Sequence, residues 1–451
     1  MTNSAPVPGA AADFSFPDFA HHRAASGIDT YVMSVHRTPL VTARLVLPAG
    51  AHFDPKDRPG LAAFTAALLE EGTETRSSEE IALVIESLGG RLGSGAGWNS
   101  SAVSVDCMAQ HLDTALELLV DIAIAPAFAT EEIERARRER LAEWLRRRDQ
   151  PGALAEEAFA RAVYESTPYD HPLLGDRVAL EAIDRDQIRH FWAEQRGLAG
   201  ATLVVAGDVS ARDILDRVGT WNGFDGDPQP LPQIKPEAPR RRVLLVDRPA
   251  AAQTEIRVGH IGPPKPHPDR TVLQVANSLL GGKFTSRINL NLREKHGYTY
   301  GAHSSFVARR GPGPFMVWSA VETESAGAAV REILGELERI RQEDVTAAEL
   351  EETQTYIRGV FPYGMQSLSG ALRRLQDLAV YRLDDDHFQR YLEDVAAVTA
   401  GQIRDATATH LRPADASIIA VGPAEDLAGQ LDELGPVEVV RPSGRERLQS
   451  A

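Results

Sequence analysis

The sequence predicts an α+β fold made of two duplicated domains, each a largely antiparallel sheet covered by helices. Helical and strand patterns are mixed along the chain without regular strand–helix alternation, which favours α+β layers over a parallel sheet. The helical segment 187–189 (Gln-Ile-Arg) returns at 402–404, and a strand ending at Gly207 returns as one ending at Gly422. The same 215 residues separate both pairs, so a helix followed by a strand occurs twice with identical spacing. The 451 residues also suit two domains of roughly 200 residues each.

The domain boundaries follow from composition. Residues 1–24 are rich in Ala, Pro and Ser at their start and are expected to form an extended N-terminal arm. The first domain then covers residues 25–222 and the second covers residues 243–451. Between them, residues 223–242 (GFDGDPQPLPQIKPEAPRRR) are rich in proline, glycine and charge, which predicts a linker.

Each predicted element of the first domain has a local signal. Apolar alternation predicts strands between residues 30 and 47, and residues 58–73 (RPGLAAFTAALLEEGT) form an amphipathic helix with proline near its start. Ser77 and Glu80 have the spacing of a capping box, and apolar residues at helical spacing follow them. The later patterns predict a strand at 102–108, helices at 112–119, 130–148 and around 187–192, and a strand at 201–206.

The second domain is expected to open with a strand at residues 243–246 (VLLV). Further on, Gly281-Gly282 interrupts one helix, and residues 285–295 form the next helix, which Gly297 ends. Residues 298–304 then enter a strand.

The composition excludes several classes of function. A net charge of −16 argues against a nucleic-acid or anionic-membrane surface, which needs clustered basic residues. The single cysteine, Cys107, allows neither an internal disulfide nor a cysteine zinc site, and we expect it to be a small strand hydrophobe. No secretory signal is visible, and no stretch approaches the roughly 20 apolar residues of a membrane span. We therefore expect a cytoplasmic protein, or a periplasmic one if a signal was removed.

The helix at residues 58–73 and the RSSEEI segment after it resemble the zinc helix of the pitrilysin or insulinase-type metallopeptidases, which include mitochondrial processing peptidase. Active members carry H-x-x-E-H there: two histidines bind Zn²⁺ and the glutamate activates a water. In this sequence the three positions are Ala63, Ala66 and Ala67, which offer neither a lone pair nor a base. The family's third ligand is a downstream glutamate, and the resemblance places it on Ala136 in the run IERAR. The resemblance therefore implies a chain that binds no metal.

Residues 279–304 resemble a second signature of the same family, LGGGxxSRLxxxLREKxGLxYxxxS. It contains an arginine and, seven residues later, a tyrosine, here Arg293 and Tyr300. In the family these two residues reach across a closed chamber toward the zinc-bound substrate. An arginine can bind peptide carbonyls or a terminal carboxylate, and a tyrosine hydroxyl can donate to the scissile carbonyl as its oxygen gains charge. Arginine near a helix end and tyrosine in a strand are also common without such a role.

The resemblance covers roughly residues 25–425 and implies the subunit of a heterodimeric zinc peptidase that lacks the metal motif. A homologous H-x-x-E-H-containing subunit would bind the zinc, and the two chains would close as a clamshell around an oligopeptide substrate. Arg293 and Tyr300 would then bind substrate and stabilise the oxyanion in trans, and this chain alone would be inactive or nearly so. Two alternatives stay open: a catalytically inert structural or assembly protein that kept the peptidase fold, and a peptide-binding homodimer.

Three other segments have weaker signals. The acidic run Asp384-Asp385-Asp386-His387 fits a charged loop between helices better than a cation site, and His21-His22 fit solvated side chains of the arm. Residues 89–97 (GGRLGSGAG) lack the Lys-Ser/Thr of a phosphate loop. In the family this region leads to an edge strand that can pair with substrate, and its glycines here indicate a flexible rim.

Overall fold

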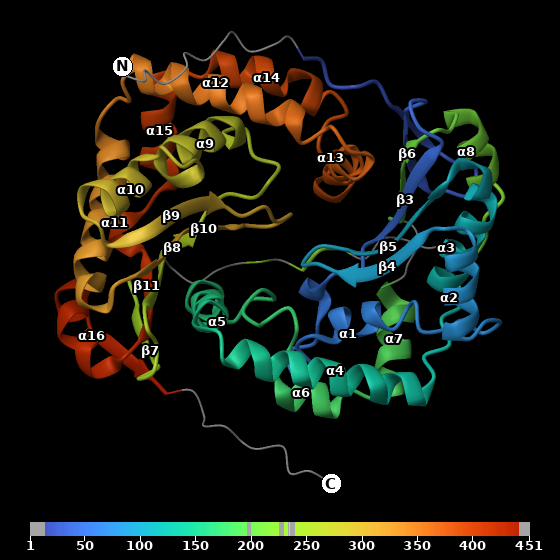
Figure 1. Ribbon diagram of the computed structural model, residues 1–451, viewed down its shortest axis with the longest axis horizontal. Helices are drawn as coiled ribbons and strands as arrows, with labels where there is room; N and C mark the ends of the chain where they lie inside the picture. Colours follow the sequence, from blue (N-terminus) through green and yellow to red (C-terminus); the bar gives the residue numbers. More distant parts are fainter. Residues whose placement is uncertain (1–13, 196–199, 225–229, 233, 235–239, 442–451) are drawn as a thin grey trace, which may run out of the picture.

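The computed structural model describes residues 14–195, 200–224, 230–232, 234 and 240–441 and contains two six-stranded sheets (Figure 1). We call residues 14–224 the first half and residues 240–441 the second half; each holds one sheet and the helices that cover it. The predicted α+β class with two duplicated, largely antiparallel sheets is confirmed. Most of the predicted linker, 223–242, lies outside the described residues, and the domain boundaries stay predictions.

The sheet of the first half has the strand order β1-β2-β6-β3-β5-β4. The β2–β6 pair is parallel, and the other neighbouring pairs are antiparallel. One edge strand, β1, comes from the predicted N-terminal arm and places Ala20 opposite Val32. The strands are β1 (Ala20–Arg23), β2 (Asp29–Ser34), β3 (Leu40–Leu47), β4 (Arg91–Ala96), β5 (Ser101–Met108) and β6 (Thr202–Gly207).

The sheet of the second half has the order β12-β7-β11-β8-β10-β9. Both neighbours of β7 are parallel to it, and the remaining pairs are antiparallel. The strands are β7 (Val243–Asp247), β8 (Thr254–Ile261), β9 (Thr299–Phe306), β10 (Pro314–Val321), β11 (Ser417–Gly422) and β12 (Val437–Val440).

The two sheets share one topology, as a duplicated domain predicts. The order β2-β6-β3-β5-β4 in the first half corresponds to β7-β11-β8-β10-β9 in the second. The repeated strands β6 and β11 have the same neighbours in the two sheets. β6 is parallel to β2 and antiparallel to β3, and β11 is parallel to β7 and antiparallel to β8. The halves differ at one edge, where β1 comes from the start of the chain and β12 from near its end.

The helices of the first half begin with α1, which is shorter than the predicted helix because it starts after Gly60, a left-handed residue with φ 90°, and ends at Ala67. The predicted capping box at Ser77 is confirmed: its hydroxyl accepts the Glu80 N–H at 3.2 Å, and the Glu80 carboxylate accepts the Ser77 N–H at 2.8 Å. The helices are α1 (Leu61–Ala67), α2 (Ser78–Ser87), α3 (Leu112–Ile124), α4 (Thr130–Arg148), α5 (Pro151–Tyr164), α6 (Arg177–Ala182), α7 (Arg185–Gln195) and α8 (Ala211–Val218), with 3₁₀ turns η1 (Ala51–Phe53) and η2 (Ala109–His111).

In the second half, the helix predicted at 285–295 is α10 continued by the π-helical turn η4, and Gly297 follows it with φ 71°. The predicted interruption at Gly281-Gly282 falls at the end of another π-helical turn, η3. The helices are α9 (Arg270–Asn277), η3 (Ser278–Gly282), α10 (Arg287–Asn289), η4 (Leu290–Lys295), α11 (Ala326–Gln342), α12 (Ala347–Tyr363), α13 (Leu368–Tyr381), α14 (His387–Ala397), α15 (Ala400–His410) and α16 (Ala424–Leu431), with 3₁₀ turns η5 (Thr323–Ser325), η6 (Pro413–Asp415) and η7 (Asp432–Leu434).

One helix of each half packs on the sheet of the other half (Figure 1). Helix α5 packs on β7, β8 and β11, and α13 packs on β3 and β6. All six residues of β6 and all six of β11 are buried, so these strands need cover on both faces of their sheets. The exchanged helices provide the second cover and join the halves through apolar packing.

The segment before β1 also joins the halves. Phe16 is 4% exposed and stacks on Phe388 of α14, with ring centroids 5.3 Å apart. His21 does not have the solvated position expected from the sequence: its ring stacks on Tyr31 at 3.9 Å, and its Nδ1 lies 2.8 Å from an Asp385 carboxylate oxygen. The acidic run at residues 384–386 thus contacts the N-terminal segment through Asp385.

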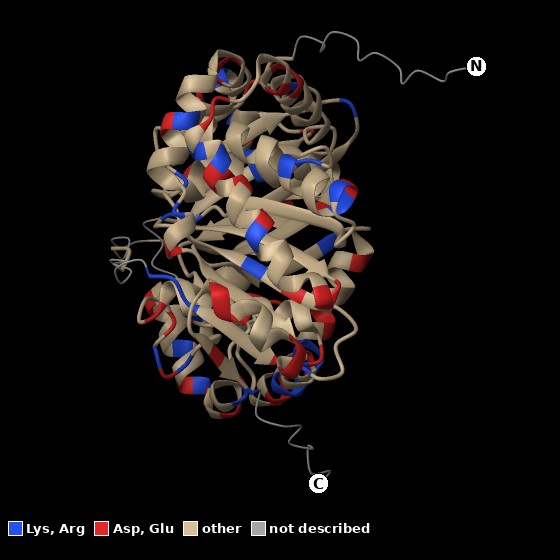
Figure 2. Ribbon diagram, turned by 90° about the vertical axis from the view of Figure 1, so that its left-hand side faces the viewer, with Lys and Arg blue, Asp and Glu red and all other residues tan. Residues whose placement is uncertain are grey.

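Acidic and basic residues are interspersed along the ribbon in the view of Figure 2. Within the residues that the structure describes, no helix combines the length and the apolar character needed to cross a membrane.

Candidate functional site

Helix α1 carries the three positions of the metal motif, and a buried carboxylate fixes its start. Asp54 accepts the backbone N–H groups of Gly60 and Ala62, each at 2.7 Å. Gly60 is required here because a Cβ would lie 2.6 Å from the Leu174 carbonyl oxygen, and its φ of 90° is left-handed. Burial raises the pKa of Asp54 to about 8, while the two backbone hydrogen bonds act in the opposite direction.

The residues around α1 do not fit a zinc ion. Ala63 and Ala67 line a cavity, and Ala66 is completely buried, so the helix presents only methyl groups. Arg140 of α4 donates from Nη2 to the Ala63 carbonyl at 2.5 Å, which places a positive charge beside the motif positions. Burial lowers the pKa of Arg140 to about 10, so it stays charged near neutral pH. Among the described residues, no group of three His, Cys, Asp or Glu donors converges at α1.

The structure corrects the predicted position of the third ligand. Ala136 is 6% exposed and packs in the core of the first half, and it does not line the cavity. The side chains of α4 that do line the cavity are Arg140, Glu143 and Arg147, which follow one another at helical spacing. Glu143 is therefore the carboxylate of α4 that lines the same cavity as Ala63 and Ala67, and its hydrogen bond to Arg146 lowers its pKa.

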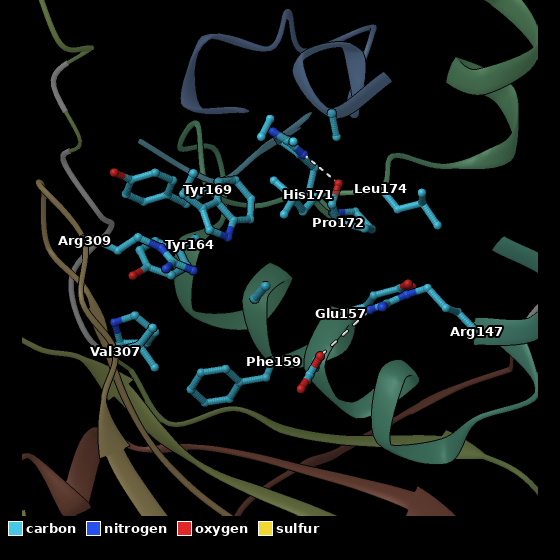
Figure 3. A pocket seen from close by; sticks show the side chains of 18 of the residues that line it. Arg147, Glu157, Phe159, Tyr164, Tyr169, His171, Pro172, Leu174, Val307 and Arg309 are labelled. Carbon is cyan, nitrogen blue, oxygen red and sulfur yellow. Dashed lines mark hydrogen bonds and ion pairs between the residues drawn. The ribbon is translucent and has the colours of Figure 1, made fainter. Parts of the chain in front are cut away.

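The cavity has a volume of about 620 Å³ and lies between the two halves (Figure 3). The first half contributes α1, β4, α4, α5 and the loop around residues 169–174, and the second half contributes residues near the β9–β10 turn. Its lining includes the aromatic or apolar residues Trp98, Phe159, Tyr164, Tyr169 and Met316 and the charged residues Arg140, Glu143, Arg147, Glu156, Glu157 and Arg309.

An arginine from the second half completes the aromatic end of the cavity. The Arg309 guanidinium lies 5.2 Å from the Trp98 ring centroid and 5.8 Å from that of Tyr169, within the range of cation–π interactions. Tyr164 donates to the Pro312 carbonyl at 2.8 Å and so fixes the turn that carries Arg309. Burial raises the pKa of both Tyr164 and Tyr169, so both hydroxyls are protonated donors near neutral pH. In Figure 3 these side chains lie at one end of the cavity, away from Arg147.

Arg293 and Tyr300 lie outside this cavity. Arg293 is on η4, with its guanidinium 4.5 Å from the Phe284 ring centroid and its Nε 3.4 Å from a Glu294 carboxylate oxygen. Tyr300 is 90% exposed near the start of β9, the edge strand of its sheet. Asn289 links the two elements, since its Oδ1 accepts the Ala302 N–H at 3.0 Å. The structure therefore places Arg293 and Tyr300 on two elements that pack on each other, η4 and β9, and brings neither to the cavity that Ala63 and Ala67 of the same chain line.

The sequence did not identify Arg309, Trp98 or Tyr169 as site residues. No local pattern indicated Arg309, because its contacts reach residues more than a hundred positions away in the sequence. Glu143 had a usable signal, since it shares a helical face with Arg140 and Arg147.

Comparison with known proteins places these features in a family. Residues 31–177 match the model of the insulinase family, peptidase family M16, and residues 182–357 match the model of the peptidase M16 inactive domain. Similar chains include a protein from Mycobacterium tuberculosis described as an uncharacterized zinc protease, 24% identical over 78% of this chain and 81% of its own length. Another uncharacterized zinc protease, from Bacillus subtilis, is 21% identical over 72% of this chain and 79% of its own length.

Solved structures show the same fold. A peptidase M16 inactive domain from Pseudomonas fluorescens has a TM-score of 0.83 at 24% identity and covers 90% of this chain and 98% of its own. A protease from Helicobacter pylori has a TM-score of 0.85 at 17% identity and covers 90% and 100%. The two matched family models, at residues 31–177 and 182–357, show that the chain belongs to peptidase family M16, the insulinase family.

Proposed function

We propose that this chain is the subunit that binds no catalytic metal in a heterodimeric zinc metallopeptidase that cleaves oligopeptides. The proposal rests on one observation: the metal-motif positions have lost their ligands, whereas the arginine and the tyrosine of the family's second signature are present. The motif positions on α1 are alanines beside a charged Arg140, whereas Arg293 and Tyr300 are kept on an accessible edge of the second half. An inert scaffold needs neither of these two residues.

The accessible pair has the chemistry required to act on a substrate held by another chain. A homologous H-x-x-E-H-containing partner would bind a zinc ion, which supplies Lewis-acid polarisation of the scissile carbonyl and an activated water. The Tyr300 hydroxyl would donate a hydrogen bond to the carbonyl oxygen as negative charge develops there. Arg293 would bind a peptide carbonyl or terminal carboxylate, and the Phe284 ring under its guanidinium would restrict its orientation.

A peptide is the ligand class that the first half favours. Strand β4 is the edge of its sheet, and Ser94, Gly95 and Ala96 of this strand also line the cavity. An extended peptide can add to such an edge by main-chain hydrogen bonds while its side chains enter an adjacent pocket. The cavity volume of about 620 Å³ lies within the roughly 300–1,000 Å³ of ordinary ligand pockets.

The role of Tyr300 can be tested with Tyr300→Phe in the complex assembled with the partner. Removing one oxyanion donor typically lowers kcat by about 100- to 1,000-fold, so we expect a loss of this order with a smaller change in KM. The matched control is Tyr363→Phe, because Tyr363 is also an exposed tyrosine of the second half, at 72% exposure on α12. A Tyr300→Phe complex with the wild-type kcat would show that the hydroxyl has no oxyanion role. A stable complex that cleaves no oligopeptide would instead favour the inert assembly protein.

A further inference from the structure

A group of three metal-ligating side chains lies in the second half and belongs to neither part of the site described above. His267 and Asp269 are in the loop that leads into α9, and His410 is the last residue of α15. Each offers one donor atom, and these three atoms all lie within 4.8 Å of one another. In the part of the chain that the structure describes, this is the one such group of His, Cys, Asp and Glu donors.

The donor separations match those of ligands that share one ion. His410 Nε2 lies 2.7 Å from Asp269 Oδ2, and His267 Nδ1 lies 3.9 Å from the same oxygen. Two ligands that each bind zinc at about 2.1 Å in tetrahedral geometry are roughly 3.4 Å apart. One of the two separations in the structure is shorter than this value and the other is longer. Small side-chain rotations would therefore bring all three donors to one ion.

The Asp269–His410 ion pair alone does not explain the arrangement. His267 Nδ1 accepts the Asp269 backbone N–H at 3.2 Å, and an ion bound at this nitrogen would replace that hydrogen bond. Asp269 occupies the N-cap position of α9, yet its carboxylate makes no capping hydrogen bond and is directed toward the histidines. The side chains of His267, Asp269 and His410 are 29%, 44% and 14% exposed, so an ion from solvent can reach them.

We propose that His267, Asp269 and His410 bind a divalent transition-metal ion, with Zn²⁺ as the best match. Two imidazoles and one carboxylate form a nitrogen–oxygen ligand set that suits zinc, whereas Mg²⁺ and Ca²⁺ prefer oxygen ligands. The ion would connect the start of α9 to the end of α15, two helices that already pack on each other, and water would complete its coordination. This site is structural and separate from the family's catalytic metal position, where α1 offers only alanines.

The test uses the tag-free full chain, stripped with EDTA and titrated with Zn²⁺ alone by calorimetry, with metal content measured after equilibrium dialysis. We expect one zinc per chain and a higher Tm with zinc, because an ion that binds only the folded state stabilises it. His410→Ala and Asp269→Asn are each expected to lower the zinc affinity at least tenfold and to abolish the Tm increase. His303→Ala is the matched control, since His303 is an exposed histidine of β9, and Mg²⁺ should not bind.

Two results would overturn the proposal. The first is the absence of stoichiometric zinc in the wild-type chain. The second is an equal zinc affinity in the wild type and both ligand variants, since this would indicate adventitious binding to surface histidines. If His410→Ala does not fold, Asp269→Asn decides the question, because Asp269 is the most exposed of the three side chains.

Discussion

Leu154→Ala changes a residue of the first half, and the structure predicts that it destabilises the sheet of the second half. Leu154 is 4% exposed on α5 and packs in one cluster with Leu244 and Val246 of β7 and Ile419 and Val421 of β11. Truncating a buried leucine to alanine costs about 2–5 kcal/mol, since apolar contacts are lost and a cavity remains. With an unfolding entropy of about 2.1 cal/mol/K per residue, a chain of 451 residues should lose about 2–5 °C in Tm.

Hydrogen exchange gives the decisive readout for this variant. If α5 is an integral cover of the second sheet, amides of β7 and β11 should exchange faster in Leu154→Ala, although the changed residue lies about ninety positions or more before them. The control is Val178→Ala on α6, where the side chain is 76% exposed and the expected change in stability is within about 0.5 kcal/mol. Unchanged protection in β7 and β11, together with a separate melting transition for each half, would refute the idea that exchanged helices join the halves.

Three further variants test the surroundings of α1. The pKa of Asp54 is about 8 in the folded chain, compared with about 3.9 in the unfolded chain. The folded state therefore holds this proton more tightly, and the contribution of Asp54 to the free energy of unfolding falls as the pH rises from about 4 through 8. Asp54→Asn should remove this pH dependence. The Tm of the variant minus the Tm of the wild type should therefore rise between pH 5 and pH 8.5. A difference that stays constant over this range would show that Asp54 does not have the raised pKa. Ala63→His with Ala67→His should add a zinc site that uses Glu143, measured in a His410→Ala background to remove the other proposed site. Added Glu143→Ala should weaken that zinc affinity at least tenfold, and an unchanged affinity would show that Glu143 does not face the motif positions.

Local sequence signals predicted most of the fold. The repeated helix and strand, 215 residues apart, identified two related sheets because each copy has the same short-range pattern. The capping box at Ser77 and the breaks at Gly281-Gly282 and Gly297 were equally local, and the structure has elements that begin or end there. Such features depend on residues three to seven positions apart, which a single sequence displays directly.

Features that depend on contacts between the halves could not be predicted in this way. The sequence predicted β6 and β11 as strands, but nothing local showed that both are buried on two faces or that α13 and α5 cover them. Arg309 joins the cavity only because the β9–β10 turn meets Trp98 of the other half. The third-ligand position was placed on Ala136 by the resemblance of a short run, whereas the structure turns Glu143 toward the cavity.

The proposed function requires that this chain complete a peptidase site whose metal belongs to a different subunit. The most direct measurement is cleavage of a quenched fluorescent oligopeptide by this chain alone, by an H-x-x-E-H-containing homologue alone, and by their mixture, all in the presence of zinc. We expect no cleavage by this chain alone and strong cleavage by the mixture. Cleavage by the isolated chain, retained after Arg293→Gln and Tyr300→Phe, would contradict it.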